Sequence, residues 1–283
     1  MRMRAPIAVV SGALALSTLT VPSAQADGGG PSPSGAPSAF AADPTTGKLT
    51  GIIVNGGADV VVGTAVKKFS VEVSASDEGG VERTAAALYQ GLYLTSKALI
   101  TSYEAHPAPC ERTATSATCR FVFEAHPKSH SGSSYLDLQN KHAGVWKTAG
   151  GGFRGLDAPG RTVVVAEDIH YGDVSLKRAA KLTADASPES VRRGADVTVK
   201  GTLSRANWDT HRYDGFGGGA GKVKLQFKKA GGAWQTVKTV SADSRGKVKA
   251  TVKASVDGSY RLAYGGSTTT GTATSPADTI DVR

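Results

Sequence analysis

The stretch KVKLQFKKAGGAWQTVKTVSADSRGKVKATVKASVDGSYRLAYGG, residues 222–266, decides the fold. Apolar and polar side chains alternate through four short runs, and Gly, Asp or Ser separates one run from the next. Alternation with a period of two is typical of half-buried strands, because successive side chains of a strand point to opposite faces. Strands at this spacing, with turns between them, predict a β-sandwich of the immunoglobulin-like kind.

The same pattern extends in both directions along the chain. DVTVKGTL (196–203) and DTIDVR (278–283) flank the stretch and complete a predicted domain over residues 181–283. Further upstream, KKFSVEVSAS places Phe69, Val71 and Val73 on one face of a strand. We therefore predict an all-β protein with two tandem immunoglobulin-like β-sandwich domains, the first over residues 48–180.

The N-terminal segment predicts export. Residues 1–26 have a basic start, an apolar run and small residues at Ala24 and Ala26, the pattern of a secretory signal peptide. Residues 27–47 are rich in Gly, Pro and Ser, which predicts a flexible, disordered linker. No later stretch is apolar over enough residues to span a bilayer. We expect a secreted protein, extracellular or loosely associated with the cell surface.

The two cysteines, Cys110 and Cys119, predict a disulfide. An exported protein carries close cysteine pairs as disulfides more often than as redox or metal sites, and the spacing is not C-x-x-C. The polar segment between them, ERTATSAT, favours a hairpin. We expect the bond to hold the two strands of this hairpin together.

Charge is distributed unevenly between the two predicted domains. Residues 27–180 contain 14 Lys and Arg against 15 Asp and Glu, whereas residues 181–283 contain 17 against 9. A basic extracellular domain can bind an anionic cell-wall polymer, a membrane surface or nucleic acid, and a solvated surface is the alternative interpretation. We predict an anionic cell-wall polymer or a carbohydrate as the partner, and no specific nucleic acid.

The C-terminal domain also resembles a known group of proteins. LTADASPESVRRGADVTVKGTLSRANWDTHRYDGFGG (182–218) and the stretch at 222–266 resemble the C-terminal domain of secreted actinobacterial, Streptomyces-like proteins with tandem immunoglobulin-like domains. FSVEVSASDEGG (69–80) and the cysteine pair resemble their first domain more loosely. The family is largely uncharacterised, and some members are labelled calcium-binding. The resemblance implies the fold and export, and it assigns no catalytic residue.

A chemically dense segment follows residue 203 and is expected to form a loop of about 18 residues. Its aromatic and polar side chains could form a sugar-binding platform, or they could anchor the loop by burying Trp208 and Tyr213 on the sandwich. The candidate ligand-binding residues are Arg205, Asn207, Trp208, Asp209, His211 and Tyr213.

Calcium is the cofactor that the sequence leaves open. Acidic residues lie at two predicted turns, and hard cations prefer clustered oxygen ligands, although no D-x-D-x-D-G loop is present. The candidate metal ligands are Asp77, Glu78, Glu167, Asp168 and Asp173. The chain has no G-x-S-x-G, no H-E-x-x-H and no complete phosphate-binding loop, so we expect a non-enzymatic protein. We predict binding or adhesion at the cell envelope through the basic C-terminal domain, with a calcium-stabilised structural role as the alternative.

Overall fold

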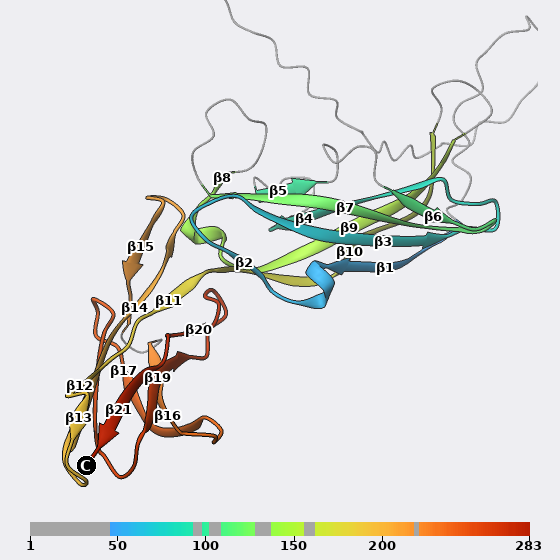
Figure 1. Cartoon of the computed structure of the whole chain (residues 1–283). Helices are drawn as coiled ribbons and strands as arrows, with labels where there is room; N and C mark the ends of the chain where they lie inside the picture. The colour runs from blue at the N-terminus through green and yellow to red at the C-terminus, as the bar shows by residue number, and fades with distance from the viewer. Residues whose placement is uncertain (1–45, 93–97, 102–108, 128–136, 156–161, 218–220) are drawn as a thin grey trace, which may run out of the picture. The chain divides into compact units, whose positions relative to one another are not determined.

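The computed structural model describes residues 46–92, 98–101, 109–127, 137–155, 162–217 and 221–283 (Figure 1). The predicted signal peptide and nearly all of the predicted linker lie outside these residues. Residues Ala42–Arg283 are assigned to one compact unit, which holds two β-sandwiches. Within the described ranges, the chain contains no helix that is long and apolar enough to cross a membrane.

Among the described residues, the first sandwich is built from strands β1 to β10 and two single-turn 3-10 helices. The strands are β1 (Lys48–Val54), β2 (Val60–Val62), β3 (Lys67–Ser76), β4 (Arg83–Gln90), β5 (Ala98–Thr101), β6 (Cys110–Arg112), β7 (Ser116–Pro127), β8 (Asp137–Leu138), β9 (Gly144–Gly155) and β10 (Thr162–Arg178). The 3-10 helices are η1 (Asn55–Gly57) and η3 (Asn140–His142).

Its two sheets have the strand order of an immunoglobulin domain. One sheet runs β1-β3-β7-β6, and the other runs β2-β10-β9-β4-β5. In immunoglobulin lettering these are ABED on one side and GFC with C′ on the other. The short strand β2 joins the edge of the second sheet by parallel pairing with β10.

The alternation in the sequence builds the core of this sandwich. Phe69, Val71 and Val73 of β3 are at most 4% exposed, as the sequence predicts. Two glycines of β9 let the opposite sheet approach closely. A Cβ on Gly150 would lie 2.8 Å from Cδ1 of Ile52, and one on Gly152 would lie 2.7 Å from Cβ of Ala75, so larger residues would push the sheets apart.

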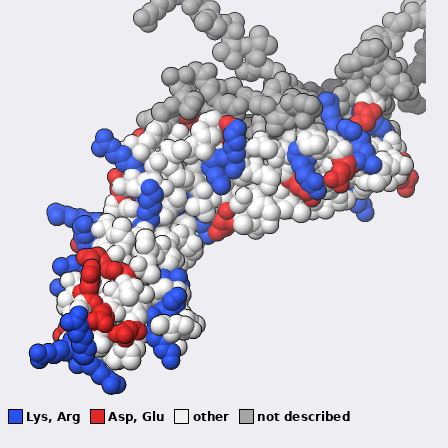
Figure 2. Space-filling model, viewed as in Figure 1, with Lys and Arg blue, Asp and Glu red and all other residues white. Residues whose placement is uncertain are grey.

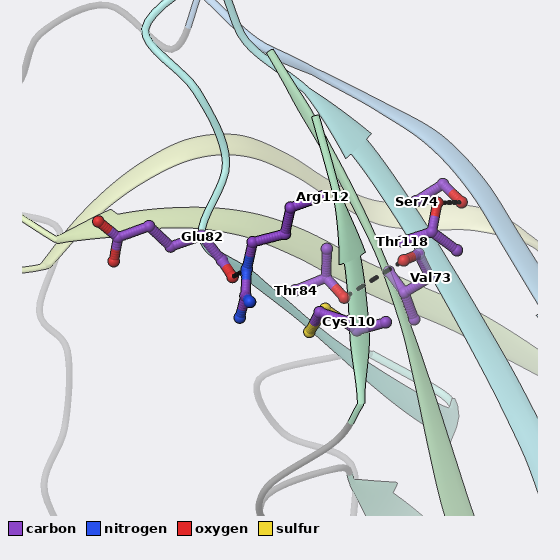
Figure 3. The surroundings of a disulfide bond; sticks show 8 residues. Val73, Ser74, Glu82, Thr84, Cys110, Arg112 and Thr118 are labelled. Carbon is purple, nitrogen blue, oxygen red and sulfur yellow. Dashed lines mark hydrogen bonds between the residues drawn. A yellow bond between two sulfur atoms is a disulfide. The ribbon is translucent and has the colours of Figure 1, made fainter. Parts of the chain in front are cut away.

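The predicted disulfide is present and joins the two strands of a hairpin (Figure 3). Cys110 of β6 is directly opposite Cys119 of β7, and their Cα atoms are 4.0 Å apart. Cys119 is fully buried, so the bond fixes the edge strand β6 to the core. Beside it, Nε of Arg112 donates a hydrogen bond to the carbonyl oxygen of Glu82. The disulfide therefore attaches β6, the outermost strand of this sheet, to β7.

The second sandwich is built from strands β11 to β21. They are β11 (Ala180–Leu182), β12 (Asp185–Ser187), β13 (Ser190–Val191), β14 (Asp196–Asn207), β15 (Arg212–Gly215), β16 (Lys222–Lys229), β17 (Gln235–Ser241), β18 (Lys247–Lys253), β19 (Gly258–Tyr264), β20 (Ala273–Thr274) and β21 (Asp278–Val282).

The second sandwich has the strand order of the first, except that β14 also pairs with β11 and β15 and that no strand of its described residues corresponds to β6. Strand β14 pairs with both β12 and β18, and the opposite sheet runs β13-β21-β19-β16-β17. Short β13 pairs with β21 in parallel, as β2 pairs with β10. The core is formed by the inward side chains of both sheets, among them Val197, Leu225 and Leu262, which are fully buried. The prediction of an all-β fold with tandem immunoglobulin-like sandwiches is confirmed.

Candidate functional site

The chemically dense segment after residue 203 is a β-hairpin, so the prediction of an 18-residue loop is wrong. Strand β14 continues to Asn207, a turn covers residues 208–211, and β15 pairs back onto β14. The side chains of Asn207 and Asp214 on the two strands join through a 2.6 Å hydrogen bond. Polar composition suggested a loop, but pairing with β15 satisfies the backbone and extends the strand.

Trp208, at the start of this turn, is buried in the core of the first sandwich. Its side chain is 0% exposed and belongs to the hydrophobic cluster that contains Val62, Leu138 and Trp146. Its indole Nε1 donates a hydrogen bond to the carbonyl oxygen of Val62 at 3.2 Å. Trp208 is therefore buried, as the structural interpretation predicts, but in the core of the first sandwich instead of its own, and its ring face is not accessible to a sugar.

Asn140, which no sequence motif indicated, organises the polar part of this contact. Its Nδ2 donates to Oδ1 of Asn207 at 2.8 Å and to Oδ2 of Asp209 at 2.6 Å. Its Oδ1 accepts from the backbone N–H of Trp208 at 3.0 Å and from Nη1 of Arg178 at 2.7 Å. An amide has two donors and two acceptor lone pairs, so Asn140 is fully used. It ties η3 of the first sandwich to the β14–β15 hairpin.

Two arginines lie in the same region, Arg178 buried and Arg205 half-buried. Arg178 is 8% exposed, and burial, with a smaller contribution from the positive charge of Arg205, lowers the pKa of Arg178 to about 10. Burial also lowers the pKa of Arg205, whose Nη1 donates to Oγ1 of Thr270 at 3.3 Å. The guanidinium of Arg205 lies 4.7 Å from the ring centroid of Phe216. Arg205 therefore packs against Thr270 and Phe216 of the protein itself.

Tyr213 and His211 complete the hairpin. Tyr213 is half-buried against the first core, burial raises the pKa of its hydroxyl, and Nζ of Lys181 lies 3.9 Å from its ring centroid. His211 has a positive φ of 57° in the turn. The six predicted ligand-binding residues are thus gathered, but around a contact between the two sandwiches. For the five other than Trp208, contact with a ligand stays a prediction.

The acidic turns predicted as calcium ligands do not come together. Asp77 is 4% exposed and accepts hydrogen bonds from Oγ1 of Thr46 at 2.6 Å, the backbone N–H of Gly79 at 2.9 Å and Nη1 of Arg154 at 2.8 Å. The bond from Thr46 contributes most to lowering the pKa of Asp77, with Gly79 and Arg154 adding to it. Asp77 therefore connects Thr46, which precedes β1, with Arg154 of β9. Its neighbour Glu78 is exposed.

The second acidic turn lies on β10. Asp168 accepts from the backbone N–H of His170 at 2.8 Å, and Asp173 contacts Nε2 of the same histidine at 3.1 Å. Glu167 is exposed on this strand. In the part of the chain that the structure describes, no three His, Cys, Asp or Glu side chains form a group that could hold a metal ion. Calcium binding at these residues therefore stays a prediction.

The positive charge of the second sandwich is arranged differently on its two outer faces. One face, formed by β12, β14 and β18, mixes both signs, and we call it the mixed face. Its lysines are Lys200, Lys247, Lys249 and Lys253, and its carboxylates are Asp185, Asp196 and Asp243.

Carboxylates neutralise much of the mixed face. Lys253 pairs with Asp196 at 3.0 Å, and Asp185 is opposite Lys200 in the strand register. An open hollow of about 500 Å³ lies on this face, and Lys200 and Asp243 both line it. Figure 2 shows acidic side chains gathered on the visible side of the C-terminal sandwich, with Lys and Arg side chains around them.

The opposite sheet presents cations without carboxylates between them. On β16, Val223 and Leu225 point into the core, so Lys222, Lys224, Gln226 and Lys228 face outward. On β19, Arg261 is directly opposite Gln226, and its Nε donates to Oε1 of Gln226 at 2.8 Å. We call Lys222, Lys224, Lys228 and Arg261 the cationic face.

Comparison with known proteins adds little to this description. No protein-family model and no curated protein matches the sequence. A marsupial T cell receptor structure is similar at 11% identity over 83% of this chain and 73% of that chain, with a TM-score of 0.38. The D00-D0 domain of intimin is similar at 13% identity over 81% of this chain and 98% of that chain, with a TM-score of 0.27.

A third similar structure is a dimeric latent PorU from Porphyromonas gingivalis, at 12% identity over 87% of this chain, with a TM-score of 0.29. The chain spans 21% of the length of that protein. These similarities are too distant to support an argument about function. The assignment of the fold rests on the strand order itself.

Proposed function

We propose that the protein is a secreted, non-enzymatic binding or adhesion protein that acts at the cell envelope. The C-terminal sandwich makes the contact, and its partner is anionic. The cationic face carries this proposal, because Lys222, Lys224, Lys228 and Arg261 share one outer sheet surface and no ion pair neutralises them within the described chain. Such a surface attracts an extended anion by its field and by direct contacts.

The immunoglobulin-like fold is compatible with this role. It provides two rigid outer sheet surfaces, and the first sandwich supports the second through the buried Trp208 and the Asn140 hydrogen bonds. A function must be argued from the site and not from the fold, since this architecture carries many unrelated activities. The charge arrangement is therefore the observation on which the proposal depends.

The test is retention of the purified protein on isolated cell walls at rising NaCl concentration. We expect retention at low salt and release as the ionic strength approaches about 0.5 M, because exposed charge pairs are screened within about 8 Å at physiological salt and over shorter distances above it. Retention that does not change with salt, or no retention at low salt, would contradict the proposal.

A further inference from the structure

Three of the four outward side chains of β16 are cations. Lys222 and Lys224 are two residues apart, and same-face neighbours on a strand lie about 6.7 Å apart. Gln226 occupies the next outward position, and Lys228 the one after it. Arg261 of β19 is directly opposite Gln226 and hydrogen-bonded to it, so its guanidinium fills the gap in the row. The row of four cations is about 20 Å long.

Trp234 holds two of these cations in place. Cζ of Arg261 lies 4.1 Å from the centroid of the Trp234 ring, and Nζ of Lys228 lies 5.3 Å from it. A cation over an aromatic ring is attracted to the ring's negative face and loses side-chain freedom. Only Nε of Arg261 is used in its bond with Gln226. Its terminal nitrogens are available for an anion, and a guanidinium fork suits phosphate well.

No acid interrupts this row on the neighbouring strands. The outward positions opposite it hold Thr239 and Ser241 on β17, and Ser259 and Ala263 on β19. Carboxylates of the same sheet are found on β21. There Asp278 accepts from the backbone N–H of Ala186 at 2.7 Å, and Asp281 pairs with Arg283 at 2.9 Å.

We propose that the cationic face binds a linear phosphodiester polymer without bases, of the polyol-phosphate kind. This rests on the proposed function and specifies its site and partner. Single charges at short intervals along β16, with Arg261 beside them on β19, match a chain that carries one anion per short repeat unit. Lysines and a guanidinium serve as phosphate ligands, and each contact releases a counterion from the polymer.

Two features distinguish this partner from other anionic ones. Binding of single-stranded nucleic acid uses aromatic rings on which bases stack, whereas Arg261 and Lys228 already cover Trp234. Binding to a membrane surface gains from exposed apolar side chains, and β16, β17 and β19 expose one large apolar side chain, Val237. A polyol phosphate needs neither feature.

The experiment compares two charge-matched variants of the full chain. One is K222Q/K224Q/K228Q on the cationic face, and the other is K200Q/K247Q/K249Q on the mixed face. Both lose three positive charges. Affinity for immobilised poly(glycerol phosphate) is measured between 50 and 300 mM NaCl, with oligo-deoxythymidine and phosphatidylglycerol vesicles as competitors. Circular dichroism and unfolding curves check that both variants fold.

We expect the cationic-face variant to lose more than about tenfold in affinity, and its plot of log K against log salt to become shallower by about two. The mixed-face variant should stay within about threefold of the unmodified protein. Equal losses in both variants would overturn the assignment of the site, as would a larger loss in the mixed-face variant. Preference for oligo-deoxythymidine or vesicles over poly(glycerol phosphate) would overturn the partner class.

The two proposals fail in different ways. If the protein stays on isolated walls in a salt-dependent manner while poly(glycerol phosphate) does not bind, the further inference is wrong and the proposed function stands. If the unmodified protein is not retained on walls at low salt, the proposed function is wrong. Poly(glycerol phosphate) binding that depends on the cationic face would then still identify a phosphodiester-binding surface.

Discussion

The two sandwiches share one topology but use the equivalent strand in different ways. Strand β4 of the first sandwich lies between β9 and β5, and β16 of the second lies at the equivalent position, between β19 and β17. The outward positions of β4 include Ala87 and Tyr89, at most 5% exposed, whereas β16 presents Lys222 and Lys224 to solvent. The fold therefore does not require cations at this strand, and they are available for binding.

The sandwiches also differ in the side-chain links that stabilise them. The first has the edge strand β6 and its disulfide, together with the Asp77–Arg154 pair. The described residues of the second include no counterpart of either, and the second contributes Trp208 to the core of the first. The disulfide and the buried ion pair thus lie in the first sandwich, whereas an outer sheet surface of the second carries cations. Substitutions in the first sandwich, at its contact with the second and on β16 test this difference.

Replacement of Trp208 by alanine should have the largest effect. The change removes a fully buried ring and leaves a cavity, which costs about 3–5 kcal/mol of the free energy of unfolding. Chemical denaturation followed by circular dichroism measures it. Trp234→Ala is the matched control, because this half-buried ring lies on the surface and should cost about 1 kcal/mol. Similar costs for the two variants would mean that Trp208 does not fasten the sandwiches together.

Asp77→Asn should remove a buried carboxylate that three groups stabilise, at a cost of about 2 kcal/mol near pH 7. The pKa of Asp77 is lowered in the folded protein. The stabilisation is therefore complete above the unfolded value near 3.8 and is lost as the pH falls through the folded pKa. The difference between the two proteins should shrink as the pH falls below about 3.8, as measured by urea unfolding. A constant difference would show that the charge of Asp77 is not what stabilises the fold.

Removal of the disulfide should lower the free energy of unfolding of the first sandwich by as much as Asp77→Asn or slightly more. The variant C110A/C119A frees β6, and a loop of about ten residues predicts a loss of about 2–3 kcal/mol in the chain-entropy model. Thermal unfolding with and without reducing agent provides an independent measurement on the unmodified protein. A variant as stable as the parent would show that β6 is held by its strand pairing alone.

Calcium should have the smallest effect. The candidate ligands Asp77, Asp168 and Asp173 already bind side-chain or backbone groups of the protein. We therefore expect the Tm to be the same within about one degree in calcium and in EDTA. A rise of several degrees with calcium would show preferential binding to the folded state and would restore the calcium-stabilised interpretation.

The sequence predicted the features that depend on local alternation. Period-two patterns placed Phe69, Val71 and Val73 in a core, and the cysteine spacing predicted a hairpin disulfide. The alternation in KVKLQFKK also predicted a half-buried strand, which is β16. Each of these depends on neighbours that are close in the sequence.

The remaining features depend on contacts between distant segments. Trp208 bonds to Val62, and Asn140 to Asp209, and no local pattern relates these positions. The place of Arg261 in the cation row depends on the register between β16 and β19, which the sequence alone does not specify. The polar composition after residue 203 favours a loop of about 18 residues, whereas the backbone there continues the sheet through β14 and β15.

The central claim is that the charge on β16 serves binding and not folding. The most direct measurement combines unfolding free energy and cell-wall retention for K222Q/K224Q/K228Q. We predict a change in stability below about 0.5 kcal/mol, as for surface substitutions, together with loss of retention at low salt. An unchanged retention, or a loss of stability of several kcal/mol, would contradict the account.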